Sequence, residues 1–168
     1  MITSDEKNIN IIAHILEYCN QIDECLSRFG NNREAFLSDV IFRNAVSMAE
    51  FQIGELSGHL SDDYKEKTKN EIPWKEIRGM RNIFAHNYLE MDVDRIWDVA
   101  TEDISVLKDF CKSQLNEFLK IKGQNIDEGS LKFIKETLKI KEWTTEAQEK
   151  NAERMAGLDE QNKNKPER

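Results

Sequence analysis

The apolar residues near the N-terminus recur at alternating steps of three and four, which is the repeat of one face of an α-helix. Only two prolines and seven glycines interrupt the 168 residues, so few backbone breakers limit the length of such helices. The repeat predicts a helix over about Asp5–Arg28, with Ser4 as its N-cap and Gly30 as its stop. The residues of this apolar stripe are Ile12, Ile15, Cys19, Ile22, Leu26 and Phe29.

Three more helices are expected downstream. One covers about Arg33–Leu60, where Gly54 and Gly58 would permit close contact with a neighbouring helix rather than end this one. After a polar loop with a short helical turn over 61–71, Pro73 begins the next helix, and the last covers about 93–121. Together these segments predict an all-α protein, an antiparallel bundle of four to five helices. The residues expected to face inward are Phe36, Val40, Ala45, Ala49, Ile53, Leu56 and Leu60 of the second helix and Ile96, Val99, Val106, Phe110, Leu115 and Phe118 of the last.

The composition changes after Gly123, and this change sets the expected domain division. Residues 1–122 would form the bundle, and 123–168 a polar C-terminal extension, helical or disordered. A short amphipathic segment with Leu131, Ile134 and Leu138 opens the extension, whereas 144–168 is almost wholly polar. Such a polar segment cannot bury enough apolar surface to fold alone.

The net charge of −8 argues against nucleic-acid binding over the whole surface, because such binding depends on phosphate neutralisation by Lys and Arg. The charge is uneven, however, since 64–88 has a local charge of +3 and 89–109 one of −5. No apolar run is long enough for a membrane span, and no signal peptide is recognisable, so we expect a cytoplasmic protein that does not bind membranes. Three cysteines without C-x-x-C spacing predict reduced thiols, with neither a metal site nor a cofactor.

The chemistry-bearing residues gather in the string R-x-x-x-x-H-x-Y, formed by Arg81, His86 and Tyr88. An arginine binds a phosphate bidentately, and a histidine exchanges a proton near neutral pH. RNA cleavage without a metal needs both functions, a cation for the phosphorane charge and a proton acceptor or donor. The string therefore indicates phosphodiester chemistry.

Helix geometry does not bring the three side chains to one point. A step of five residues turns Arg81 and His86 about 140° apart, whereas a step of seven places Tyr88 nearly on the stripe of Arg81. The groups would converge if Arg81 reached around the helix or if the helix ended near His86. They would also converge if a second copy of the motif arrived from a symmetric subunit.

Three segments of this chain resemble the HepT-like toxin family of the HEPN superfamily, over roughly residues 7–118. They are 73–80 running into the motif, 45–55 with its Ile-Gly-Glu triplet, and 95–100 with Asp103 and Leu107. The resemblance implies a homodimeric, metal-independent endoribonuclease, the toxin of a type VII toxin–antitoxin pair. It also implies that Arg81 and His86 are catalytic and that Asn82 positions phosphate or water.

The resemblance further implies a partner, a cognate minimal nucleotidyltransferase antitoxin that adenylylates (AMPylates) the tyrosine of the H-x-Y element, here Tyr88. The pair Asp92 and Asp94 resembles the D-x-D of such a transferase. No Gly-Ser precedes it at the required distance, so the transferase would be a separate protein.

Two other interpretations of the function remain open. The chain could be a non-catalytic helical module that binds a minimal nucleotidyltransferase, or a substrate-binding domain for that transferase. The motif itself also has a structural interpretation, in which His86 bonds a carbonyl, Arg81 pairs with Glu55 or Asp103, and Tyr88 packs at a helix end. A structural or surface role is expected for His14 and His59, and Trp74 and Trp97 are expected to anchor the core or an interface.

Overall fold

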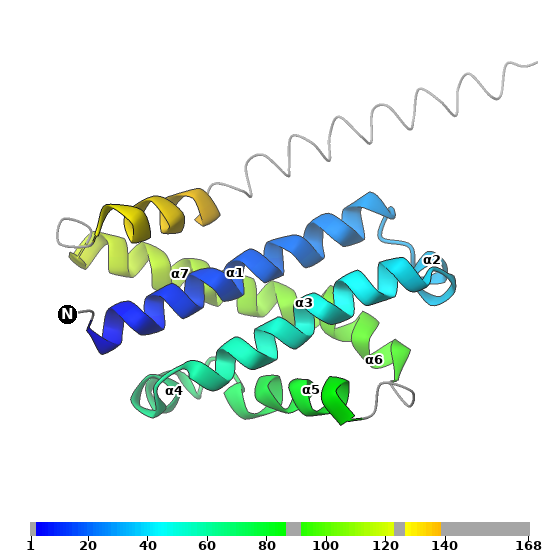
Figure 1. Ribbon diagram of the computed structural model, residues 1–168, viewed down its shortest axis with the longest axis horizontal. Helices are drawn as coiled ribbons and strands as arrows, with labels where there is room; N and C mark the ends of the chain where they lie inside the picture. The colour runs from blue at the N-terminus through cyan, green and yellow to red at the C-terminus, as the bar shows by residue number, and fades with distance from the viewer. Residues whose placement is uncertain (1–2, 87–91, 123–126, 139–168) are drawn as a thin grey trace, which may run out of the picture. The chain divides into compact units, whose positions relative to one another are not determined.

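The computed structural model describes residues 3–86, 92–122 and 127–138, with the backbone alone for 82–86 and 122. Within these residues every regular element is a helix and no strand occurs. The elements pack into a bundle in which α3 lies between α1 and α5 (Figure 1). The all-α helical bundle predicted from the sequence is therefore confirmed.

Helix α1 spans Ser4–Arg28, and its first residues form a capping box rather than the predicted serine cap. The Thr3 hydroxyl accepts the N–H of Glu6, while the Glu6 carboxylate accepts the N–H of Thr3 at 2.7 Å. Two donors left unpaired at the helix start are thereby satisfied, which Ser4 inside the helix could not do. At the other end Gly30 adopts φ 68°, which confirms it as the stop after this helix.

The predicted second helix is in fact two helices. Helix α2 spans Arg33–Ser38 and α3 spans Val40–His59, with Asp39 in an extended conformation between them. The Asp39 carboxylate accepts the N–H groups of Ile41 and Phe42, so a side-chain cap replaces helical hydrogen bonds at this point. The break rotates the buried face: Val40 and Ala45, predicted inward, are exposed, while Phe42 and Val46 are buried.

A second break in phase occurs in the last bundle helix. Helix α6 spans Val93–Asp98, a π-helical segment η2 spans Val99–Asp103, and α7 spans Ile104–Lys122. A π-turn takes more residues per turn than an α-turn, so it shifts every later side chain around the axis. Val106, predicted inward, is consequently 60% exposed, and Ile104 and Leu107 are buried in its place.

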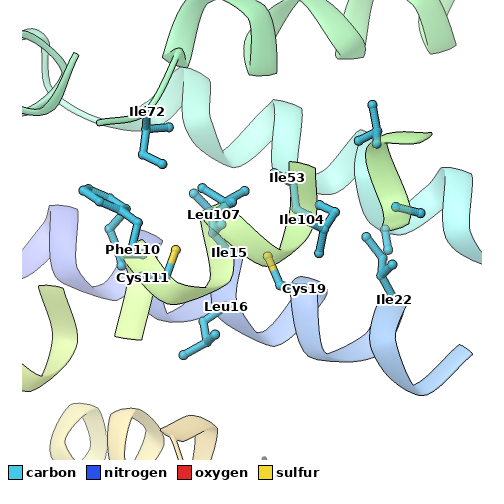
Figure 2. Close-up of a cluster of buried hydrophobic side chains, with 14 of the residues drawn as sticks. Ile15, Leu16, Cys19, Ile22, Ile53, Ile72, Ile104, Leu107, Phe110 and Cys111 are labelled. Atoms are coloured by element: carbon cyan, nitrogen blue, oxygen red, sulfur yellow. The ribbon is translucent and has the colours of Figure 1, made fainter. Parts of the chain in front are cut away.

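The hydrophobic core lies where α1 meets α3 and α7 (Figure 2). Cys19 and Cys111 are free, buried thiols within it, which agrees with the expectation of reduced core cysteines. Burying each large apolar side chain contributes about 1.5–3 kcal/mol, so this region is the main source of stability. The side chains labelled in Figure 2 are Ile15, Leu16, Cys19, Ile22, Ile53, Ile72, Ile104, Leu107, Phe110 and Cys111.

A further helix, residues 128–138, packs on the bundle, and the described residues up to 138 form one compact unit. Ile134 of this helix is fully buried, and the ring of Phe133 lies 4.5 Å from that of His14. The side-chain amide of Asn20 donates to the carbonyl of Thr137 at 3.4 Å. Residues 139–168 lie outside the described part of the chain, and the division at residue 122 stays a prediction.

Two shorter elements complete the bundle, α4 at Asp62–Thr68 and α5 at Trp74–His86. The first confirms the predicted helical turn in the polar loop, and the second confirms a helix after Pro73. Trp74 anchors the start of α5: its indole N–H donates to the Thr68 hydroxyl at 2.8 Å, and its ring meets Phe110 edge to face. Because Trp74 is only 5% exposed, it is a core anchor, as predicted.

Candidate functional site

The helix that carries the motif, α5, contacts α3 at two glycines. A Cβ atom at Gly54 would lie 3.1 Å from both the Arg81 nitrogen and the Ile77 oxygen, so the two backbones touch there. A Cβ atom at Gly58 would lie 3.8 Å from Nε of Arg78, which is ordinary van der Waals distance. Gly54 therefore permits close contact between the helices, as the sequence predicted, whereas the space at Gly58 does not require a glycine.

These contacts also give the register of the two helices. Gly58 lies against Arg78, and Gly54, one turn earlier on α3, lies against Arg81, one turn later on α5. The helices are therefore antiparallel, and the backbone of α5 beyond Arg81 runs over the turn of α3 that holds Glu50. The second half of the motif helix thus lies above the middle of α3.

Arg81 forms an ion pair through its Nε atom with the Glu55 carboxylate of α3. The two side chains are 45% and 30% exposed, so the pair is reachable from solvent. Asp103, the other partner considered for Arg81, pairs instead with Arg95 at 3.3 Å. A guanidinium has five N–H donors in a flat fork, so an ion pair through Nε leaves the terminal nitrogens suited to a phosphate.

The face of α3 below the motif helix carries two buried polar groups that sequence reasoning did not identify. Glu50 is 1% exposed and Ser47 is 5% exposed, and Oε1 of the first and Oγ of the second have no hydrogen-bond partner. Burial raises the pKa of Glu50 well above its usual value, nearby Asp103 raises it further, and Arg95 opposes the shift. This environment therefore favours the neutral form of the carboxyl. The sequence signal that could have identified Glu50 was a glutamate on the inward face of a helix.

Of the four predicted site residues, the structure describes the side chain of Arg81 alone. Arg81 lies on α5 beside α3, whereas for Asn82 and His86 the backbone alone is described, within the same helix. Tyr88 lies outside the described residues. The convergence of Arg81, His86 and Tyr88 therefore stays a prediction. Tyr64, a tyrosine outside the motif, is described in full: its hydroxyl donates to Gln114 at 3.1 Å, and burial raises its pKa.

A hollow of about 530 Å³ lies beside the first turns of α5, between that helix and α4. Four basic and three acidic side chains line it, which agrees with the local positive charge of this part of the sequence. The described residues, those of the hollow included, contain no group of three or more His, Cys, Asp or Glu that could hold a metal ion. Nor does any helix in the described ranges have the length and apolarity to cross a bilayer.

Comparison with known proteins identifies the family. The profile of the HepT-like ribonucleases, described as "Ribonuclease HepT-like", matches residues 15–114. "Putative RNase MJ1380" of Methanocaldococcus jannaschii is 36% identical over 94 residues, which cover 56% of this chain and 84% of that protein. "Putative RNase TTE0752" of Caldanaerobacter subterraneus is 30% identical over 109 residues, 65% of this chain and 91% of the relative. "Probable ribonuclease HepT" of Thermococcus cleftensis is 40% identical over 75 residues, 45% of this chain and 67% of the relative. No solved structure matches the chain.

Proposed function

The chain belongs to the HepT-like ribonuclease family, and from this premise we propose that it is a toxin endoribonuclease that cleaves RNA in the cytoplasm without a metal ion. The observation that carries the proposal is the position of Arg81: the family match includes it, and it sits half exposed on the motif helix with its guanidinium oriented by Glu55. A cation held in this way is suited to bind a phosphate in a fixed orientation.

In the proposed reaction the 2'-oxygen of RNA bonds to the adjacent phosphorus, and the bond from phosphorus to the 5'-oxygen breaks. A base takes the proton of the 2'-hydroxyl, and an acid gives a proton to the departing 5'-oxygen. His86 fills one of these roles, Arg81 stabilises the negative charge that develops on the phosphorane, and Asn82 positions the phosphate. The products are a 2',3'-cyclic phosphate and a 5'-hydroxyl.

The proposed active form is a homodimer, because helix geometry turns Arg81 and His86 about 140° apart and a second copy would complete the site. An exposed apolar stripe on α3 supports this form. Ile41 is 74% exposed and Met48 is 58% exposed, and they share a seven-residue spacing with Glu55, the partner of Arg81. A second copy seated on this stripe would reach the Glu55–Arg81 pair, so the apolar contact and the site would adjoin.

The proposed regulator is a minimal nucleotidyltransferase antitoxin that adenylylates Tyr88, as a type VII toxin–antitoxin pair requires. Tyr88 follows Arg81 by seven residues, so a helix continued to it would carry both on one stripe. An AMP group there would add negative charge and bulk beside the phosphate-binding arginine, and would block substrate.

The test is a nuclease and growth assay on Arg81→Ala and His86→Ala. Each is expected to reduce cleavage by about 10²–10⁴, as loss of a general acid–base group or a phosphate clamp does, with helicity unchanged. Cleavage should persist in EDTA and leave a 2',3'-cyclic phosphate. A His86→Ala protein that cleaves like wild type, or a pair of variants that both unfold, would support the structural interpretation of the motif instead.

A further inference from the structure

Two basic side chains that line the hollow between α4 and α5, one from each helix, both approach Gly58 of α3. Lys65 of α4 donates from Nζ to the carbonyl oxygen of Gly58 on α3, at 3.2 Å. Arg78 of α5 passes over the same glycine, with Nε at 3.8 Å from where a Cβ would stand. An ammonium and a guanidinium thus approach one residue that has no side chain of its own.

The acidic residues of the hollow do not cancel this charge. Glu66 is paired with Lys69, at the far end of α4. Asp62 forms an ion pair with Lys65 at 3.9 Å, but its side chain is fully exposed, so water screens the pair. Lys75 and Glu76, both exposed on the first turn of α5, balance each other. A positive charge therefore remains at Gly58, where Lys65 is held in place with only 20% of its side chain exposed.

This point lies next to the proposed catalytic arginine along one line of contact. Arg78 precedes Arg81 by three residues, which is about 4.5 Å along the axis of α5. Both lie against α3, one at Gly58 and the other at Gly54. A chain of phosphates that follows the boundary between α3 and α5 would meet the two arginines in succession.

We propose that Lys65 and Arg78 form a second phosphate-binding subsite, which holds the RNA backbone next to the phosphate that Arg81 would bind. The inference rests on the proposed ribonuclease function. The aromatic wall of the hollow supports recognition of the backbone alone, because the Trp74 ring is buried against Phe110 and offers no free face for a base. The subsite would therefore bind RNA without preference for sequence.

The experiment measures binding of a fluorescent twelve-nucleotide 2'-O-methyl RNA, which lacks the attacking hydroxyl and stays intact. Arg78→Gln and Lys65→Gln are each expected to raise Kd about tenfold, as loss of a charge-assisted hydrogen bond does. Each should also lower the slope of log Kd against log salt concentration by about 0.7, one phosphate contact on a single strand. Arg28→Gln, at the end of α1 remote from α4, is the control for loss of one positive charge (Figure 1).

Cleavage of two substrates separates this inference from the proposed function. A dinucleotide has one phosphate, so Arg78→Gln should cleave it like wild type and lose efficiency only on the longer RNA, through KM. Equal binding by wild type and Arg78→Gln, an equal loss in Arg28→Gln, or an equal loss on both substrates would overturn the subsite. If wild type cleaves nothing while binding still depends on Arg78, the subsite stands and the ribonuclease proposal fails. Arg78 is exposed, so its variant provides the test even if Lys65→Gln unfolds.

Discussion

Two neighbouring buried stripes of α3 differ in the size and polarity of their side chains. One carries Phe42, Val46, Ala49 and Ile53, which are all buried in the core shared with α1 and α7. The other carries Ser47, Glu50, Gly54 and Ser57, and at Gly54 it meets the backbone of α5. One helix therefore presents large apolar side chains to the core and small or polar groups to the helix of the motif.

The difference indicates that the first stripe mainly stabilises the fold, whereas the second mainly positions Arg81. Apolar burial is roughly proportional to area, so the stripe of large side chains supplies most of the folding free energy that α3 contributes. The second stripe buries less apolar area, but at Gly54 it lets two backbones touch, which fixes the position of Arg81 closely. We expect substitutions on the first stripe to change stability and those on the second to change activity.

The largest effect on stability is expected from Phe42→Ala. The ring stacks on Phe29 at a centroid distance of 4.1 Å and is fully buried, so its loss leaves a cavity. Unfolding in urea should show a loss of about 3–5 kcal/mol. Ile121→Ala, which truncates a side chain that is 71% exposed, is the control and should change little. If cleavage per folded molecule fell as steeply as stability, the two stripes would not be separable.

The next largest effect is expected from Gly54→Ala, and the same substitution at Gly58 is its comparison. Gly54→Ala places a methyl group 3.1 Å from the backbone of α5, so one helix must move, at a cost of about 1–3 kcal/mol. The shift would displace Arg81 and reduce kcat by more than the loss of stability explains. Gly58→Ala makes only ordinary contact and removes a helix-weakening glycine, so stability should stay or rise by up to about 1 kcal/mol. Equal melting temperatures for both variants would contradict the close contact at Gly54.

The helices and the start of α5 could be predicted from the sequence, because apolar repeats and the Pro-Trp pair are local signals. The break at Asp39 could not, since an aspartate inside a helical repeat is compatible with either a cap or a surface position. The π-turn at 99–103 likewise has no signal in the spacing, and it made the prediction for Val106 wrong. At the site, the Glu55 partner of Arg81 was one of two open alternatives, because sequence spacing does not fix the register between helices.

The second stripe is also expected to make stability depend on pH, through Glu50. Because the pKa of Glu50 is raised on folding, the native state binds its proton more tightly than the unfolded state does. Stability from this group is thus full below the unfolded pKa, about 4.5, and is lost as the pH rises through the folded value, by at most about 1.4 kcal/mol per pH unit. Glu50→Gln should remove this slope. Urea unfolding of both proteins between pH 5 and 8 measures it, and parallel curves would mean that Glu50 is ionised in the native state.

The smallest change in stability is expected from Glu55→Gln, which tests whether the ion pair with Arg81 serves position rather than folding. Both side chains are partly exposed, so water screens the pair and its loss should cost less than about 1 kcal/mol. Glutamine removes the charge but keeps a polar side chain of the same length beside Nε of Arg81, so cleavage should fall less than in Arg81→Ala. Glu55→Ala removes the acceptor as well, and should lower kcat further at similar stability. A loss of stability in Glu55→Gln as large as that in Gly54→Ala would instead make the pair a structural contact, and the contrast between the two stripes of α3 would no longer hold.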